Sequence, residues 1–371
     1  MIPILLWISL WICVYVSKNL ACCKAFFDKP LSYKKVVYLF CLFAMFFIMI
    51  RMVHSLGICN KKEGIDMKRW KAVFLFTIGA GAFGFTPIFV KLSFSAGYSL
   101  AELNVSQMLI AAFTLWLIAL LKHRQIHLTK KQLIRLLSAG SLTGATSIFY
   151  YGSMQYVPAS IAIILLFQFV WIGVIYEWLF DRKAPTIATS ISVVLTLSGV
   201  FFAADVLNGD FFALSTVGVV LGICSAFSYA GFIYVSGRVA TQIDPLFRAA
   251  IMITGSLLLM IIVFPPTFLF TDAAASSIWF YGAGAALFGA ILPPLFFAVS
   301  APHLPTGLAT ILGSVELPVA VVMASMILSE TVTVLQWFGI ALILLAIAFG
   351  EVAGFARRMH ASKKAGKFTQ P

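Results

Sequence analysis

A single acidic residue lies near the middle of a long apolar segment. Glu316 follows Pro305 by 11 residues and precedes Leu328 by 12, so it would sit at mid-depth if the segment crossed a membrane. A charge there costs about 2.5–3.5 kcal/mol on insertion scales, and ionisable groups at such depth usually face a cavity and have a function. Apolar surroundings favour the neutral acid. Glu316 is therefore a candidate proton site or partner for a cation; the alternative is a neutral carboxyl that only joins helices.

Prolines interrupt three apolar segments at comparable depths. Pro318 lies close to this carboxyl and removes a backbone donor, which frees a carbonyl one turn back, near Ser314. Pro87 and the pair Pro293-Pro294 do the same in two other segments. Irregular backbone within a membrane is tolerated where protein or a water-filled cavity satisfies it. We expect the three breaks to share a central cavity, although a packing kink explains each proline alone equally well.

Aromatic and amide side chains occur at similar levels of these segments. They could line a pocket for an apolar or amphipathic solute, with tyrosine hydroxyls orienting it, although packing against lipid explains many of them. Gln168 lies one residue from the position that corresponds to Glu316 in the first half of the chain, and Gln107 adds a second amide. The aromatic candidates are Phe85, Tyr150, Tyr151, Trp171 and Tyr229, with Phe83, Phe149 and Phe296 beside them.

The segments that carry these residues are those of a helical membrane protein. Hydrophobic residues make up 61% of the chain and charged residues 11%, whereas soluble domains carry about a quarter charged residues. The apolar residues form blocks of roughly 20, the length of a membrane-crossing helix, and their continuity excludes the alternating strands of a β-barrel. Ten spans are predicted: Ala72–Phe94, Leu100–Leu121, Leu136–Met154, Pro158–Phe180, Pro185–Ala204, Ser215–Val235, Pro245–Phe264, Ile278–Ser300, Pro305–Leu328 and Val334–Val352.

The ten spans form two repeats of five, and an odd number per repeat inverts the second relative to the membrane. Ala82-Phe83-Gly84-Phe85 in the first span matches Ala226-Phe227-Ser228-Tyr229 in the sixth. We place the first repeat at 67–209 and the second at 210–354. Inverted repeats with a site near the midplane are a device for alternating access, which indicates transport.

The distribution of Lys and Arg predicts the orientation of the spans. All basic clusters of the loops and tail fall on one side of the ten-span arrangement, the side that is cytoplasmic in most membrane proteins. Both ends of the ten-span unit are therefore expected in the cytoplasm of a bacterial cell, with the spans in its inner membrane. The net charge of +13 is mostly accounted for by this topology, so nucleic-acid binding is disfavoured. The basic tail 355–371 can lie against anionic lipid.

The first 66 residues have no counterpart in the repeat. They contain five of the six cysteines and two short apolar runs, Ile2–Val16 and Val36–Ile50. A signal sequence is disfavoured because a positive start and a small-residue cleavage site are missing. Two alternatives stay open: one or two extra N-terminal helices, or a misplaced gene start, with Met67 as the true first residue. The codons for Lys61-Lys62-Glu63-Gly64 can contain AAGGAGG, a ribosome-binding sequence, shortly before Met67.

Several catalytic and cofactor signals are missing from the sequence. There is no glycine-rich phosphate-binding loop, no HExxH and no metal-like spacing of Cys and His. An ATP-driven pump, a metal site and an enzyme are therefore disfavoured, and no cofactor is expected.

Taken together, the residues resemble the EamA-type members of the drug/metabolite transporter superfamily from Met67 to Gly354. The resemblance rests on the duplicated five-helix unit, on Phe85-Thr86-Pro87-Ile88-Phe89-Val90-Lys91, and on Ser314-Val315-Glu316-Leu317-Pro318-Val319 followed by Leu328-Ser329-Glu330. It implies ten helices with cytoplasmic ends and secondary transport of small metabolites, often outward. Family members commonly carry an arginine where this chain has Gln107, so the resemblance does not imply a charge-paired site there.

The sequence favours a secondary exporter that alternates around a cavity containing Glu316, with possible proton coupling through that residue. Its partners would be a small-molecule substrate and the lipid bilayer. Phosphorylated substrates are disfavoured because no cation lies at mid-depth, which leaves amino acids, amphipathic drugs or other small metabolites. An importer of the same fold and a lipid flippase or other lipid-handling protein are the alternatives; substrate, direction and oligomeric state stay open.

Overall fold

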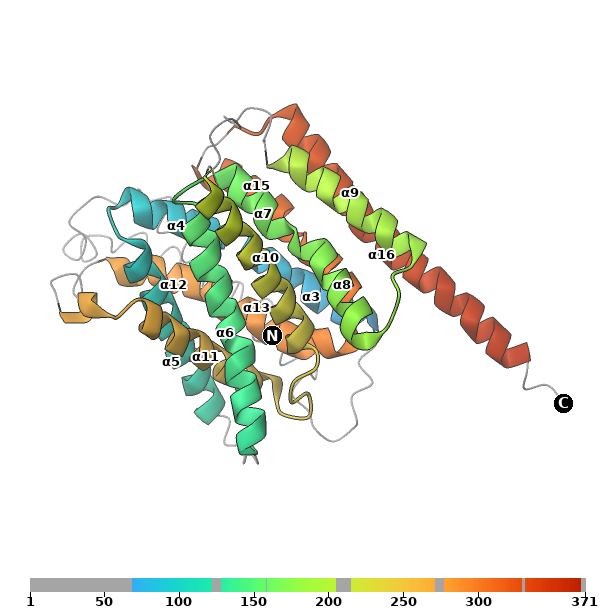
Figure 1. Cartoon of the computed structure of the whole chain (residues 1–371), viewed down its shortest axis with the longest axis horizontal. Coiled ribbons are helices and arrows are strands. Elements are labelled where there is room, and N and C mark those ends of the chain that lie inside the picture. Colours follow the sequence, from blue (N-terminus) through green and yellow to red (C-terminus); the bar gives the residue numbers. More distant parts are fainter. Residues whose placement is uncertain are drawn as a thin grey trace, which may run out of the picture. The chain divides into compact units, whose positions relative to one another are not determined.

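The computed structural model describes residues 69–121, 128–157, 159–204, 215–270, 277–328 and 331–367. These residues form helices joined by short connections, without a strand in the described ranges (Figure 1). The all-α class predicted from the sequence is therefore confirmed. The alternatives for the first 66 residues lie outside the described part of the chain.

Each predicted span corresponds to one helix or to a helix in two or three consecutive pieces. The elements of the first half are α3 (Arg69–Phe83), α4 (Thr86–Ser95), α5 (Leu100–Leu121), α6 (Lys130–Ser153), α7 (Ala159–Phe167), α8 (Phe169–Asp181) and α9 (Ile187–Ala203). Those of the second half are α10 (Thr216–Ser236), α11 (Pro245–Val263), η4 (Thr267–Phe270), α12 (Ile278–Ala285), η6 (Ala286–Ile291), α13 (Leu292–Ser300), η7 (Ala301–His303), α14 (Thr306–Gly313), α15 (Glu316–Leu328) and α16 (Val334–Lys367).

Seven helical segments of the described chain are long and apolar enough to cross a membrane. Two further apolar helices, Ile187–Ala203 and Val334–Gly350, are shorter. Helix α6 has 24 residues, but basic side chains at Lys130, Lys131 and Arg135 lower the hydropathy of its start. A polytopic membrane protein is thus confirmed, and the count of ten crossings stays a prediction.

Three of the four interrupted spans contain the prolines singled out above. Pro87 lies in the first turn of α4, just after the break from α3. Pro318 lies in the first turn of α15, and the backbone N–H groups of Ser314 and Val315 bond to carbonyls three residues back instead of four. Pro293 and Pro294 open α13 after η6, which is a π-helix. Because proline has no N–H and its ring meets the carbonyl four residues earlier, regular α-helix cannot pass through these points.

The fourth break, between α7 and α8, has no proline and is explained by Gln168. Its backbone N–H bonds to the carbonyl of Leu165 at 3.3 Å. Its side-chain Nε2 donates to the carbonyl of Ile164 at 3.0 Å, the group that the backbone N–H would contact in an α-helix. The side chain therefore replaces the lost backbone bond, so the interruption leaves that carbonyl satisfied.

The helices pack in a pattern that is preserved when the two halves are exchanged. Helix α6 packs on α10 as α13 packs on α3, and α6 packs on α11 as α12 packs on α5. The pairs α5–α11, α8–α14 and α9–α16 each join a span of the first repeat to the equivalent span of the second, and the last pair lies side by side in Figure 1. Such an arrangement is expected of two repeats related by a pseudo-twofold axis, and it interleaves the halves.

Glycines allow the closest of these helix contacts, between α6 and α11. A Cβ added at Gly140 would overlap the backbone of Met252, and one added at Gly255 would overlap the backbone of Leu137. The Ser256 hydroxyl donates to the carbonyl of Gly140 at 2.6 Å. Small residues at a helix interface bring backbones together in this way in membranes, where apolar burial gives little driving force.

We predict that Gly140→Ala destabilises the protein, because the atoms that the new methyl group meets are backbone and cannot move aside. The expected loss is about 1–3 kcal/mol of unfolding free energy, measured as a lower temperature of unfolding in detergent. Gly152→Ala in the same helix is the control, since the nearest atom to a Cβ there is Leu221 Cδ1 at 3.6 Å. Equal stability of the two variants would contradict the packing argument.

Candidate functional site

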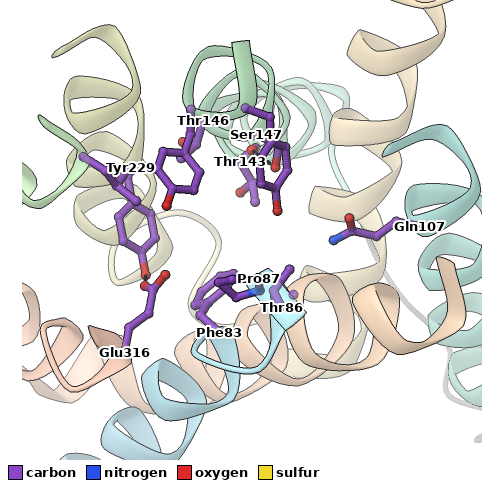
Figure 2. Close-up of a pocket in the computed structure, with 13 residues that line it drawn as sticks. Phe83, Thr86, Pro87, Gln107, Thr143, Thr146, Ser147, Tyr229 and Glu316 are labelled. Atoms are coloured by element: carbon purple, nitrogen blue, oxygen red, sulfur yellow. Dashed lines mark hydrogen bonds between the residues drawn. The ribbon is translucent and has the colours of Figure 1, made fainter. Parts of the chain in front are cut away.

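A cavity lies where the interrupted helices meet (Figure 2). Its volume, taken as the space open to the centres of water-sized molecules, is about 60 Å³. Its walls come from α3, α4, α5, α6, α7, α10, η6 and α15, so both halves of the chain contribute. The lining residues are Phe83, Thr86, Pro87, Gln107, Thr143, Thr146, Ser147, Tyr150, Tyr151, Leu166, Tyr229, Gly289 and Glu316.

Glu316 provides the acidic end of the cavity. It is the first residue of α15, directly after the break from α14. The N-terminus of a helix stabilises negative charge, so the interruption places the carboxyl where its ionised form is least costly. The Tyr229 hydroxyl donates to Glu316 Oε2 at 3.3 Å, and Figure 2 shows the two side chains meeting at one side of the cavity.

An uncharged polar wall faces the cavity away from Glu316. Gln107 on α5 and Thr86 on α4 are 2% and 5% exposed, and Thr143 on α6 is 5% exposed. Gln107 Oε1, Thr86 Oγ1 and Thr143 Oγ1 are buried and have no hydrogen-bond partner among the described residues. Figure 2 shows the Gln107 amide and the Glu316 carboxyl on opposite sides of the cavity.

Helix α6 contributes a stripe of hydroxyl groups. Thr143, Thr146, Ser147 and Tyr150 all line the cavity, and their spacing of three, four and seven residues puts them on one helix face. The Thr146 hydroxyl donates to the carbonyl of Leu142 at 2.8 Å, and that of Ser147 to the carbonyl of Thr143 at 3.4 Å. The first three of these residues were not predicted from the sequence, although hydroxyl side chains at helical spacing within an otherwise apolar segment indicate a polar helix face.

The structure brings together seven of the residues singled out from the sequence: Phe83, Pro87, Gln107, Tyr150, Tyr151, Tyr229 and Glu316. Phe85 instead stacks on Phe288, with ring centroids 4.7 Å apart. Gln168 bonds to its own helix and accepts from Trp171 Nε1 at 2.8 Å, so neither lines the cavity. Pro293, Pro294 and Pro318 lie at breaks next to the cavity without lining it. The functional roles of all these residues stay predictions.

A second polar cluster joins the two halves at the ends of α8, α10 and α14. Arg238 forms an ion pair with Asp181, and its guanidinium lies 3.7 Å from the ring centre of Tyr234. Arg238 Nη1 also donates to Thr306 Oγ1 at 2.8 Å, and the Tyr234 hydroxyl donates to Asp181 Oδ1 at 3.0 Å. Beside it, the backbone N–H of Gly307 donates to Glu177 Oε2 at 2.6 Å.

Comparison with known proteins places the chain in a family. A sequence model described as the EamA-like transporter family matches residues 70–204 and again residues 216–350. The chain belongs to the EamA-like transporter family. The double match confirms the two repeats and the resemblance to the drug/metabolite transporter superfamily.

Relatives of this EamA-like protein include named transporters. It is 28% identical to a protein of Salmonella typhimurium named threonine/homoserine exporter RhtA, over 70% of this chain and 89% of the relative. The protein of the same name from Escherichia coli K12 is 28% identical over 66% of this chain and 79% of the relative. An uncharacterized transporter of Synechocystis is 25% identical over 53% of this chain and 60% of the relative.

A solved crystal structure supports the fold of this EamA-like chain. It superposes with a TM-score of 0.62 over 77% of this chain and 100% of the solved one, at 14% identity.

Among the described residues no group of three or more His, Cys, Asp or Glu is placed to hold a metal ion. The family and the relatives show a transporter of small molecules in a membrane, for which no enzymatic reaction is implied.

We predict that the cavity is reached by small water-borne reagents. In protein whose native cysteines are replaced, Ser147→Cys should react with a methanethiosulfonate reagent in membranes, because Ser147 lines the cavity. Ser192→Cys is the matched control, since Ser192 is fully buried on α9 and does not line the cavity. Labelling at Ser192 but not at Ser147 would contradict the assignment of the cavity.

Proposed function

We propose that the protein exports small amino acids in exchange for protons, with Glu316 as the group that binds the proton and the solute's amino group in turn. The observation that carries this proposal is the position of Glu316, a carboxyl in a cavity whose thirteen lining residues include no Lys, Arg or His. Without a basic partner in the lining, the charge of this carboxyl is balanced by a proton or by a cationic group of a solute.

The exchange follows from competition for one carboxylate. When the cavity opens to the outside, a proton binds Glu316 and the ammonium group of the solute leaves. When the cavity opens to the cytoplasm, the proton dissociates and a new ammonium group takes its place. Since each partner excludes the other, the protein carries a solute in one direction and a proton in the other. The Tyr229 hydroxyl, within hydrogen-bond distance of Glu316, can support the carboxylate in both states.

The size of the cavity and the names of the relatives support an amino-acid substrate. A volume of about 60 Å³ open to the centres of water-sized molecules is small, which suits a small amino acid better than a bulky drug. Two relatives with more than three quarters of their length matched are named threonine/homoserine exporters. The sequence left amino acids, drugs and other metabolites open, and the cavity favours the first.

Alternating access also requires contacts that close one end of the cavity and break when that end opens. The ion pair between Asp181 on α8 and Arg238, just after α10, joins the two repeats. The distribution of basic residues puts this end of the protein at the cytoplasm. We propose that this pair, with Thr306 and Tyr234 around it, closes the cytoplasmic end in the state that the structure describes.

We predict that Glu316→Gln abolishes proton-driven export. The amide cannot exchange a proton and carries no charge for the ammonium group, so uphill export should fall at least about a hundredfold, the factor typical of a lost buried charge partner. The measurement is amino-acid efflux from vesicles with an imposed pH gradient. Glu102→Gln is the control, because Glu102 lies at a span end and bonds to Ser99. Undiminished pH-dependent export by Glu316→Gln would refute coupling through this residue.

We predict that exchanging the charges of Asp181 and Arg238 in a double variant restores the export that either single substitution lowers. Asp181→Arg and Arg238→Asp each place like charges together and should expose the cavity to cytoplasmic reagents. The double variant re-forms the pair with opposite polarity and should recover export by about tenfold over either single variant, as expected for a coupling of one to two kcal/mol. Additive losses in the double variant would show that the pair does not act as a gate.

A further inference from the structure

Three unpaired polar atoms belong to the side chains of the uncharged polar wall of the cavity. They are Gln107 Oε1, Thr86 Oγ1 and Thr143 Oγ1, each buried and without a hydrogen-bond partner in the part of the chain that the structure describes. An unpaired buried polar atom is destabilising, and native proteins contain few of them. Three from three different helices, all on residues that line one cavity, indicate a place that a ligand group completes.

The π-helix η6 makes room at this wall. A Cβ added at Gly289 would lie 2.8 Å from Gln107 Nε2 and 3.0 Å from Thr86 Oγ1, so both polar side chains converge on the space that this glycine leaves open. Gly289 is the residue four positions before Pro293, where proline disrupts α-helical bonding and the π-helix forms. The absence of a side chain at Gly289 therefore gives the Gln107 and Thr86 side chains the room to lie together at the cavity.

Neighbouring hydroxyl groups on α6 differ from this set because each donates a hydrogen bond to a backbone carbonyl of its own helix. Thr146, one turn from Thr143, donates to the carbonyl of Leu142 at 2.8 Å, and Ser147 donates to the carbonyl of Thr143. All three residues line the cavity, yet Thr143 alone among them has an unpaired oxygen. Among the residues that line the cavity, the unpaired atoms therefore belong to Thr86, Gln107 and Thr143 alone, and an unpaired oxygen is not a general property of the α6 hydroxyl groups.

We propose that Thr86, Gln107 and Thr143 form a specificity subsite that binds a neutral hydroxyl group of the transported solute, at the side of the cavity away from Glu316. This inference rests on the proposed export of amino acids through the same cavity. A hydroxyl donates to Gln107 Oε1 and accepts from a threonine hydroxyl, so it satisfies atoms of both kinds. A methyl group leaves all three atoms unpaired, and a carboxylate cannot donate and has no cation in the lining.

The consequence is selection between solutes of equal size. Sites built to hydrogen-bond a substrate hydroxyl reject the analogue that lacks it, because their own polar groups are then left unpaired in a desolvated place. Threonine and valine form such a pair, since a hydroxyl in one replaces a methyl group in the other. The contact between Glu316 and the amino group is the same for both solutes, so it contributes nothing to the difference in their export.

The test compares export of threonine and of valine by the full chain in proteoliposomes with a pH gradient. We expect wild-type protein to export threonine about tenfold more efficiently than valine, the factor supplied by one hydrogen bond between neutral groups. Thr143→Val and Gln107→Leu should bring the ratio towards one by lowering threonine export while valine export persists. Persistent valine export also shows that each variant is folded.

Thr146→Val is the matched control on the same helix face and should keep the wild-type ratio. If Thr143→Val lowers export of both solutes equally, or if wild-type protein does not distinguish them, the subsite is refuted while amino-acid export stands. If wild-type protein exports neither amino acid, the proposed function fails and the inference fails with it. Glu316→Gln separates the two ideas further, because it should remove pH-driven export of both solutes, whereas Thr143→Val should lower export of threonine alone.

Discussion

A carboxyl group in the middle of an apolar helical bundle is the constraint on which the rest of the structure depends. Hydrocarbon cannot solvate Glu316, so the protein must supply a cavity, a hydrogen-bond donor and a favourable local field. The break before α15 gives the carboxyl a helix N-terminus, Tyr229 gives it a donor, and six other elements of the bundle line the cavity around it.

The interruptions are arranged so that the membrane-embedded backbone loses few hydrogen bonds. Tighter turns of the chain at Ser314 and Val315, the side chain of Gln168 and the π-helix before Pro293 each solve the problem differently. The fourth and ninth predicted spans both break, as the repeat requires, whereas the first breaks without the sixth and the eighth without the third. The two halves therefore share a packing plan but differ at the cavity, where Glu316 and the polar wall lie on different sides.

The sequence predicted the cavity best from residue types that are rare in membrane-spanning segments. A mid-span carboxylate, prolines within apolar segments and amides such as Gln107 are costly in a membrane, and most of those singled out lie at or beside the cavity. Aromatic residues were less informative, because Phe85 and Trp171 satisfy packing and local bonding equally well outside it. Thr86, Thr143 and Gly289 escaped notice because small polar residues are common at helix contacts. These residues matter because the fold brings them to one cavity from distant parts of the sequence. Gly289 also depends on a π-helix, which no periodicity of the sequence predicts.

Competition between a proton and an amino group for Glu316 is the central claim of this account. It is tested most directly by proton release when threonine is added to purified protein in weakly buffered detergent solution, over a series of pH values. The account predicts that threonine binding releases a proton from the wild-type protein where the carboxyl is protonated, and that Glu316→Gln releases none. Binding of threonine without proton release at any pH, or equal release by the variant, would contradict it.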